Sequence, residues 1–142
     1  MRFENKGVLV TGATGGIGRE TCLQFAAEGA AVAVTDLDLS LAERLANEIE
    51  EKGGRAVGYE LDVTNQEQTD AVVNQAATDL GSIDIIFCNA GIREIQPAHQ
   101  LPLDEWKNVI EVNVTGVFVS AQSFAKHCIS ESKPGVIINT CL

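Results

Sequence analysis

The sequence predicts an α/β fold built on a doubly wound parallel sheet. Five short apolar segments alternate with longer segments of helical periodicity, an order typical of strands joined by helices. The apolar segments show no regular polar alternation, as expected for parallel strands that helices cover on both faces. A glycine-rich loop separates the first strand from the first helix. Together with the right-handedness of crossover connections, these features favour the strand order 3-2-1-4-5.

Local signals set the bounds of each element. Strands are expected at residues 7–11, 31–36, 56–61, 83–88 and 135–140, and helices at 19–28, 40–51, 65–80 and about 104–129. Glycines follow the first three helices, where glycine commonly ends a helix: Gly29, Gly53-Gly54 and Gly81. Ser40, with Glu43 three residues later, is the candidate N-cap of the second helix. Asn65 or Thr64 is the candidate N-cap of the third.

Residues 11–18, with the sequence TGATGGIG, predict a phosphate-binding loop. Gly12 permits the tight turn, Gly16 lets the backbone approach a pyrophosphate, and Gly18 lets the helix pack closely on the strand. The helix N-terminus adds unpaired N–H groups and a partial positive charge. Gly18 is followed by Arg-Glu and not by the Lys-Ser/Thr of a Walker A loop, which argues against nucleoside triphosphate chemistry. The alternative is a glycine-rich turn that binds nothing.

The composition predicts one globular domain, residues 1–142, in the cytoplasm. A chain of 142 residues that is 45% hydrophobic can bury a core and is too apolar for disorder. Its net charge of −10 argues against nucleic acid or an anionic membrane as partner. No transmembrane or signal-peptide segment is recognised. The four cysteines form no C-x-x-C pair and are expected to be buried and reduced, and no metal site is expected.

Asp36, at the end of the second strand, is the candidate residue for recognising a nucleotide ribose. It lies eighteen residues after Gly18, where a carboxylate can accept hydrogen bonds from both adenosine ribose hydroxyls. The same carboxylate would repel a 2′-phosphate, no basic residue precedes Gly16 in the loop, and Leu37 follows the aspartate. The expected cofactor is therefore NAD and not NADP. The alternative is an aspartate that only caps a turn.

These motifs and three further stretches resemble the classical short-chain dehydrogenase/reductase family, whose cofactor domain is Rossmann-like. The stretches are Asp62-Val63, Asn89-Ala90-Gly91 and Asn113 within VNVTG, residues 112–116. The resemblance covers essentially the whole chain but only the first half to three-fifths of a family member, so the family's C-terminal strands are absent. The three glycines at 15, 16 and 18 also fit extended members such as sugar-nucleotide epimerases. Asn-Ala-Gly and Asn113 favour the classical group.

The resemblance implies a role for each matched residue. Asp62 and Val63 would hold the adenine ring, Asn89-Ala90-Gly91 would pass the cofactor's ribose and brace the sheet, and Asn113 would kink the long helix and hold a water in a proton relay. The implied cofactor-binding residues are Gly12, Thr14, Gly15, Gly16, Ile17, Gly18, Asp36, Leu37, Asp62, Val63, Asn89, Ala90, Gly91 and Val112. Each of these residues also has an alternative role when it is considered alone. Asp62 could simply start a helix, Asn89 could form a turn, and Asn113 could be a polar residue whose hydrogen bonds are satisfied within its helix.

Residues 109–119, VIEVNVTGVFV, are apolar nearly all round and predict a helix buried on more than one side. The family packs this helix against the sheet and, in many members, against a second subunit. We therefore expect a homo-oligomer, and the alternative is the central helix of a monomer. The fifth strand is also apolar on both faces, which is typical of a central strand. If it lay at the edge of the sheet, its open apolar edge would favour aggregation.

The family's catalytic Ser-Tyr-Lys set is not found in this chain. The family uses a Tyr-x-x-x-Lys pair, but the only tyrosine, Tyr59, lies in the third strand with Val63 four residues later. Counting from Asn139, the family's serine position falls on Leu142 and a neighbouring serine position on Cys141. We expect a truncated chain, whether cleaved, frameshifted or partial, that is inactive alone.

The primary hypothesis is the NAD-binding part of an oxidoreductase that transfers a hydride between nicotinamide and a secondary alcohol or ketone. A non-catalytic dinucleotide-binding or oligomerisation module is the second hypothesis, and a fragment of an extended-family epimerase or dehydratase is the third. A tyrosine and a lysine encoded in a longer transcript would favour the first hypothesis. A natural stop after Leu142 would favour the second hypothesis. The substrate is not predicted, because the family's selecting residues usually lie beyond the missing tyrosine.

Overall fold

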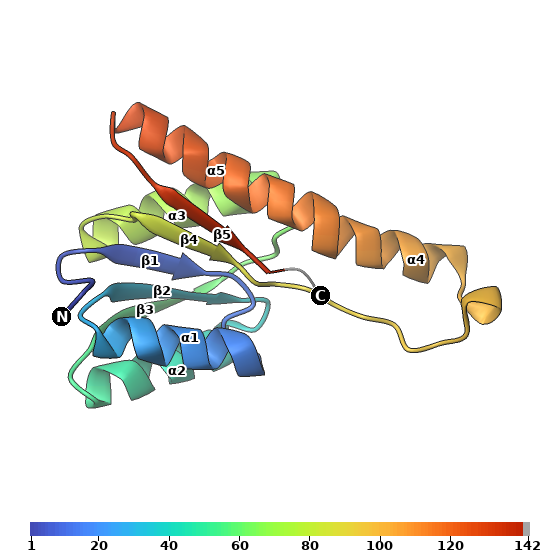
Figure 1. The fold of residues 1–142 in the computed structure, drawn as a ribbon, viewed down its shortest axis with the longest axis horizontal. Helices are drawn as coiled ribbons and strands as arrows, with labels where there is room; N and C mark the ends of the chain where they lie inside the picture. Colours follow the sequence, from blue (N-terminus) through green and yellow to red (C-terminus); the bar gives the residue numbers. More distant parts are fainter. Residues whose placement is uncertain (141–142) are drawn as a thin grey trace.

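The computed structural model describes residues 1–140, which form a five-stranded parallel sheet with helices on both faces (Figure 1). The strands are β1 (Gly7–Val10), β2 (Ala31–Asp36), β3 (Arg55–Glu60), β4 (Ile85–Cys88) and β5 (Val136–Asn139). Their order is β3-β2-β1-β4-β5, and every neighbouring pair is parallel. The predicted fold class and strand order are therefore confirmed.

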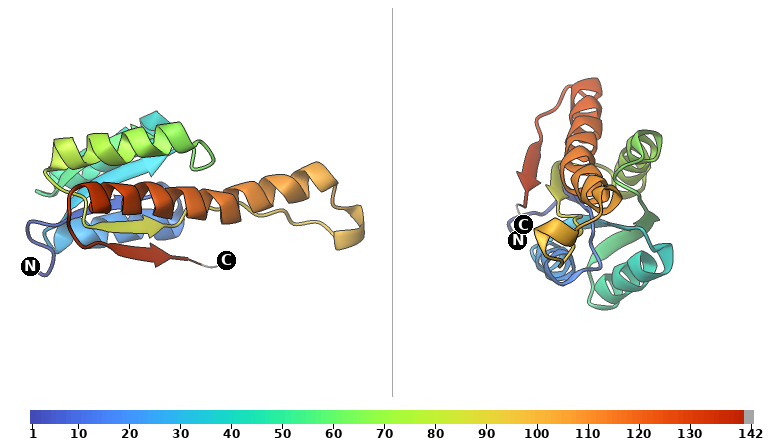
Figure 2. Two further views of the ribbon diagram at one scale, coloured as in Figure 1. Left: turned by 90° about the horizontal axis from the view of Figure 1, so that it is seen from above. Right: turned by 90° about the vertical axis from the view of Figure 1, so that its right-hand side faces the viewer.

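Two hydrophobic cores lie on the two faces of the sheet. Helices α1 (Gly16–Ala27) and α2 (Leu39–Glu51) cover one face, and α3 (Gln66–Leu80) and α5 (Gly116–Ser130) cover the other (Figure 2). Successive β1 residues alternate between them, because Val8 and Val10 pack toward α1 and α2 while Leu9 packs toward α3 and α5. Each fully buried aliphatic side chain contributes about 1.5–3 kcal/mol. Burial on both faces explains why the strands lack polar alternation.

The helix ends follow local hydrogen bonding, with one correction to the expected caps. Helix α2 begins after Asp38, whose side chain accepts a 3.2 Å hydrogen bond from the Leu41 N–H, so Ser40 is not its N-cap. The chain turns two residues earlier than expected because Asp38 already has the extended backbone of a cap. Asn65 caps α3 by accepting from the Gln68 N–H at 3.0 Å. Gly29 follows α1 with a positive φ of 95°.

The long helix expected at 104–129 is interrupted and extends well beyond the sheet. A 3-10 turn (Ala98–Gln100) precedes α4 (Leu103–Ile110), and a π turn (Glu111–Thr115) joins α4 to α5. The α4 end projects away from the body of the molecule as an arm (Figures 1 and 2). Nothing in the described chain covers the outer side of this arm, so burial on several sides is wrong for the single chain.

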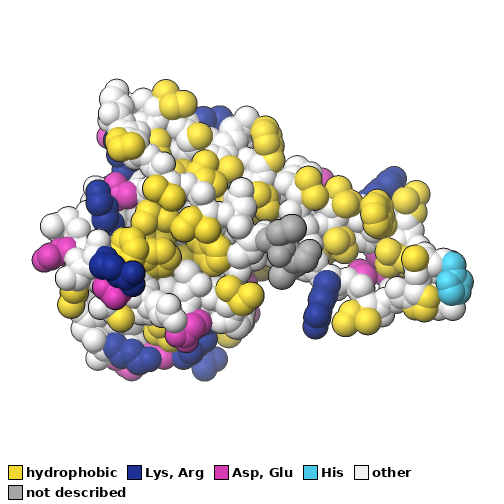
Figure 3. Space-filling model, in the orientation of Figure 1, with side chains coloured by type: hydrophobic (Ala, Val, Ile, Leu, Met, Phe, Trp, Pro, Cys, Tyr) yellow, Lys and Arg dark blue, Asp and Glu magenta, His cyan; other side chains and the backbone are white. Residues whose placement is uncertain are grey.

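Hydrophobic side chains on the arm and on β5 face solvent. Trp106, Ile110, Val114 and Phe118 are exposed, with Phe118 at 61%, and their four-residue spacing places them along one side of the arm. We call these four residues the arm stripe. Within residues 1–140, strand β5 pairs with β4 alone, and all four residues of β5 are exposed. Hydrophobic side chains gather over this region in Figure 3.

Two absences hold for the described residues, 1–140. None of their helices has the length and hydrophobicity needed to cross a bilayer. Nor do they bring together three or more His, Cys, Asp or Glu side chains that could ligate a metal. Cys22, Cys88 and Cys128 are buried free thiols, as expected, whereas Cys141 and Leu142 lie outside the described residues.

Asp84 ties the starts of three strands together. Its carboxylate accepts hydrogen bonds from the Gly7 N–H at 2.8 Å and the Ser82 hydroxyl at 2.7 Å, and it pairs with the Lys133 ammonium at 3.4 Å. Burial alone would raise the pKa of Asp84, but these donors outweigh it and hold the pKa below its usual value.

We expect Asp84→Asn to lower stability near neutral pH but much less in acid. The lowered pKa means that the ionised Asp84 stabilises the fold above the unfolded-state pKa, and that this contribution disappears as pH falls through the folded-state pKa. Urea unfolding at pH 7 should show a loss of about 1 kcal/mol, and this difference should shrink toward pH 3. A difference that is constant with pH would contradict the assignment.

Candidate functional site

A cavity of about 720 Å³ lies at the carboxyl ends of the strands. It opens beside the ends of β1 and β4, which are neighbours in the sheet but continue into helices on opposite faces. In doubly wound folds, ligands bind at such a switch point. The lining residues are Gly12, Thr14, Gly15, Gly16, Ile17, Asp36, Leu37, Leu61, Asp62, Val63, Asn89, Ala90, Gly91, Ile92, Arg93 and Val112.

The structure places every candidate cofactor residue at this cavity except Gly18, which lies beneath the loop. A Cβ on Gly18 would come within 2.4 Å of the Gly12 carbonyl oxygen, so glycine is required for α1 to approach the loop. Leu61, Ile92 and Arg93 also line the cavity but were not among the predicted residues. Leu61 and Ile92 directly adjoin matched motifs, and that adjacency was the available signal for those two residues.

The glycine loop has the conformation and the open space that a phosphate needs. Gly12 has a φ of 58°, a left-handed conformation that favours glycine. Apart from its two chain neighbours and the backbone of its own helix, no atom of residues 1–140 lies within 4 Å of the position that a Cβ would take on Gly16. Gly15 precedes α1 with an extended backbone and makes no side-chain cap, which leaves the first-turn N–H groups of α1 for a ligand.

Thr11 and Asn89 join the loop to the end of β4. The Thr11 hydroxyl accepts hydrogen bonds from the backbone N–H groups of Asn89 and Ala90, both at 3.0 Å. In return, the Asn89 side-chain amide donates to the carbonyl oxygens of Thr11 at 3.3 Å and Gly12 at 3.1 Å. We call these four hydrogen bonds the Thr11–Asn89 clamp. They satisfy backbone groups that the diverging strand ends leave without sheet partners.

The Asp36 carboxylate is held against the glycine loop. Its Oδ2 accepts from the Thr14 N–H at 3.0 Å and from the Thr14 hydroxyl at 2.7 Å. Its Oδ1 accepts from the Leu37 N–H at 2.8 Å. Two carboxylate oxygens offer about four acceptor positions, and these three hydrogen bonds leave one position for a further donor. A ligand hydroxyl could also replace the Thr14 hydroxyl as a donor to Asp36.

Asp62 starts the turn that leads into α3. Its Oδ1 accepts from the Thr64 N–H at 2.9 Å and the Thr64 hydroxyl at 2.6 Å, and its backbone N–H donates to the Gln68 side chain at 2.7 Å. This is the helix-start role that the sequence left open. Among the described residues, the second carboxylate oxygen of Asp62 has no hydrogen-bond donor, and the residue lines the cavity.

Asn113 lies within the π turn and uses its side-chain amide to hold the loop after β4. Its Oδ1 accepts from the Ile92 N–H and its Nδ2 donates to the Ile92 carbonyl oxygen, both at 2.8 Å. The π turn coincides with the predicted kink, because the extra residue of a π turn shifts a helix locally. One acceptor position and one N–H of the amide remain for a water.

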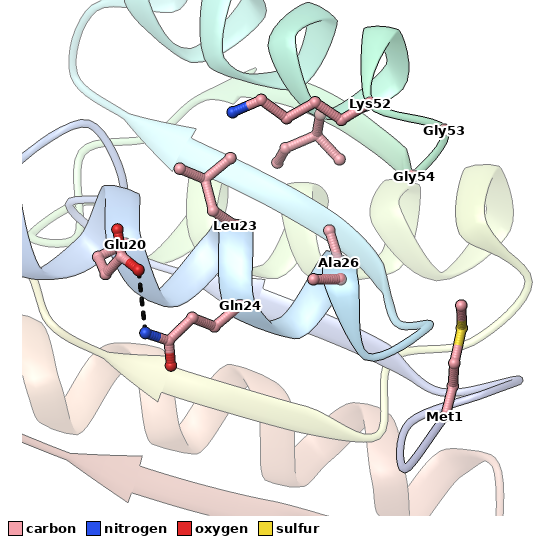
Figure 4. Close-up of a pocket in the computed structure, with 10 residues that line it drawn as sticks. Met1, Glu20, Leu23, Gln24, Ala26, Lys52, Gly53 and Gly54 are labelled. Atoms are coloured by element: carbon pink, nitrogen blue, oxygen red, sulfur yellow. Dashed lines mark hydrogen bonds between the residues drawn. The ribbon is translucent and has the colours of Figure 1, made fainter.

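Two other features near the strands carry no comparable chemistry. Burial raises the pKa of the Cys88 thiol, at the end of β4, to about 11, so the thiol stays protonated and poorly reactive. A separate groove of about 390 Å³ lies over α1 and α2 (Figure 4). Its Gln24 side chain donates to Glu20 at 2.9 Å, and apolar Leu23 and Ala26 make up much of the rest. It contains no helix N-terminus.

A sequence model of short chain dehydrogenases matches residues 6–141. The chain belongs to the short-chain dehydrogenase family. It is 38% identical to 3beta-hydroxysteroid dehydrogenase 1 of Eggerthella lenta, covering 96% of this chain and 53% of the relative. It is 35% identical to 5-keto-D-gluconate 5-reductase of Escherichia coli K12, with the same shares. The crystal structure of NAD+-bound xylitol dehydrogenase superimposes with a TM-score of 0.92 at 36% identity, over 99% of this chain and 54% of that one. The chain thus spans about half the length of these relatives.

We expect Thr11→Val to destabilise the fold although the two side chains have the same shape. The valine leaves two N–H groups without an acceptor in a place where Thr11 is almost fully buried. Each unsatisfied buried donor costs about 1–3 kcal/mol, so urea unfolding should show a loss of about 2–6 kcal/mol for the two donors. In the control Thr78→Val, the lost hydrogen bond is exposed and stability should change by less than about 0.5 kcal/mol. Equal effects would contradict the clamp.

Proposed function

We propose that this chain is the NAD-binding part of a dehydrogenase that transfers a hydride between nicotinamide and a secondary alcohol or ketone. The observation that carries the proposal is the cavity at the switch point, which combines an open glycine loop with the Asp36 carboxylate. Membership of the short-chain dehydrogenase family supports the reaction class.

The residues present fit a dinucleotide. The open space over Gly16 and the N-terminus of α1 suit a pyrophosphate, and Asp36 suits the adenosine ribose beside it. Asp62 and Val63 would bind the adenine ring on the β3 side, and Asn89 to Gly91 would contact the second ribose on the β4 side. When bound, NAD supplies the carbon that accepts the hydride from the alcohol. The chain's own contribution is to orient the cofactor and exclude water.

Among residues 1–140, the lining of the cavity holds no tyrosine, lysine or histidine that could act as general acid or base. The alcohol must lose a proton as it loses the hydride, and the ionisable residues lining the cavity are Asp36, Asp62 and Arg93. Tyr59 lies in β3 and donates its hydroxyl to Asp79 at 2.7 Å, and burial with that contact raises its pKa above the usual value. We therefore propose that the 142-residue chain binds NAD but does not turn over alone.

The substrates named for the relatives do not converge on one compound. The three proteins compared above are named for a hydroxysteroid, a keto-acid and a polyol. A dinucleotide-binding module without catalytic function is the second candidate, and it is favoured by a described cavity lining whose ionisable residues are Asp36, Asp62 and Arg93, with no tyrosine, lysine or histidine among them.

We expect this chain to bind NAD+ and to discriminate strongly against NADP+. A charge-assisted hydrogen bond from the ribose to Asp36 contributes about 1.5–3 kcal/mol, whereas a 2′-phosphate would meet the carboxylate's negative charge. Calorimetry with both cofactors should show at least about tenfold weaker NADP+ binding. Asp36→Ala should weaken NAD+ and reduce the discrimination. Glu60→Ala, which removes an exposed acid from the end of β3, should change neither. Equal affinity of the unmodified chain for both cofactors would contradict the proposal.

We also propose that the chain self-associates through the arm stripe. An exposed apolar surface of this kind is typical of protein interfaces. The arm lies clear of the sheet, so a second copy can pack along it (Figure 1).

Sedimentation at micromolar concentration should show dimers or larger species. Phe118→Glu should shift the population toward monomer, because it places a charge within the apolar surface of the arm stripe. Leu39→Glu makes the same change at an exposed position on α2 and should leave association intact. A monomeric unmodified chain, or equal effects of the two variants, would contradict the assignment.

A further inference from the structure

The cavity has opposite charges at its two ends. Asp36, the last residue of β2, and Asp62, which follows β3, lie on one side of the glycine loop, and Arg93 lies on the other side, after β4. Arg93 is the cationic residue of the lining, which includes no Lys or His. In a chain of net charge −10, a cation at a cavity wall is the natural attractor for an anionic ligand.

The backbone next to Arg93 is held by hydrogen bonds, whereas the Arg93 side chain is not paired with a carboxylate among residues 1–140. The residue before it, Ile92, is bound through both its N–H and its carbonyl oxygen to Asn113. The Arg93 side chain is exposed and takes part in none of the ion pairs formed among residues 1–140. A guanidinium held in this way can offer its planar pair of N–H donors to carboxylate or phosphate oxygens without first breaking a salt bridge.

We propose that Arg93 binds an anionic group of the substrate, a carboxylate or a phosphate, at the end of the cavity where the alcohol or ketone reacts. The inference rests on the proposed function, because the direction of the dinucleotide defines that end. With the adenosine half at Asp36 and the pyrophosphate over the glycine loop, the reacting half of the cofactor extends toward Gly91 and Val112, next to Arg93. Arg93 is a specificity-determining residue, and it takes no part in the proton transfer.

The competing assignment for Arg93 is the pyrophosphate of the cofactor itself. The glycine loop and the N-terminus of α1 already suit that group, and they belong to β1 and α1, not to the loop after β4. The two assignments make different predictions. An arginine that binds pyrophosphate affects cofactor affinity, whereas one that binds substrate affects only the ligand added after the cofactor.

The test uses three probes that share one ring: cyclohexanecarboxylate, cyclohexyl phosphate and cyclohexanol. Each is titrated by calorimetry into the 142-residue chain saturated with NADH. We expect at least one anion to bind tenfold or more tightly than cyclohexanol, and the tighter of the two identifies the anionic group. Arg93→Gln should abolish that preference, and Arg93→Lys should keep part of it because the charge remains. Lys107→Gln, the same change of charge on the exposed surface of α4, should preserve it.

A parallel NADH titration separates this inference from the proposed function. Arg93→Gln should bind NADH within twofold of the unmodified chain. If NADH does not bind the unmodified chain, the proposed function and this inference both fall. If NADH binds but the anions and cyclohexanol bind alike, or if Arg93→Gln leaves the anion preference intact, only the role of Arg93 is overturned. If Arg93→Gln weakens NADH and the anions equally, Arg93 belongs to the pyrophosphate site and the inference is likewise overturned.

Discussion

The Thr11–Asn89 clamp is the constraint on which the site depends. At a switch point, two neighbouring parallel strands end together and continue toward opposite faces, so their last backbone groups lose their sheet partners. Here one buried hydroxyl and one side-chain amide replace those partners with four hydrogen bonds. The clamp keeps the glycine loop and the loop after β4 at a fixed separation, and the cavity is the space that this separation leaves.

Outward from the clamp, each wall of the cavity is fixed by a further polar contact. Asp36 ties the end of β2 to Thr14 in the glycine loop, and Asn113 ties the π turn to Ile92 after β4. The same contacts keep the charged residues of the cavity apart. Asp36 and Asp62 lie on one side of the glycine loop, and Arg93 lies on the other. A dinucleotide and an anionic substrate would each meet the end of the cavity that suits their chemistry.

Much of this arrangement could be predicted from the sequence, because it depends on short-range signals. Apolar runs located all five strands, and the spacing of Gly12, Gly16 and Gly18 located the loop that opens the cavity. The cap of α2 was misplaced because Asp38 and Ser40 are both good caps, and only the direction of the chain leaving β2 decides between them. The projection of α4 beyond the sheet, and with it the exposure of Trp106 and Ile110, depends on tertiary geometry that no local pattern encodes. Arg93 was missed for the same reason, since nothing in the neighbouring residues marks it as part of a cavity.

The central claim is that the switch-point cavity binds the dinucleotide, and backbone amide NMR of the 15N-labelled chain with NAD+ tests it most directly. Each amide reports its own surroundings, so the pattern of shifts locates the ligand without relying on turnover. We predict that the largest shifts fall in residues 12–18, at Asp36 and Asp62, and in residues 89–91. Shifts centred instead on the groove around Leu23 and Gly54 (Figure 4), or no shifts at saturating NAD+, would contradict the account.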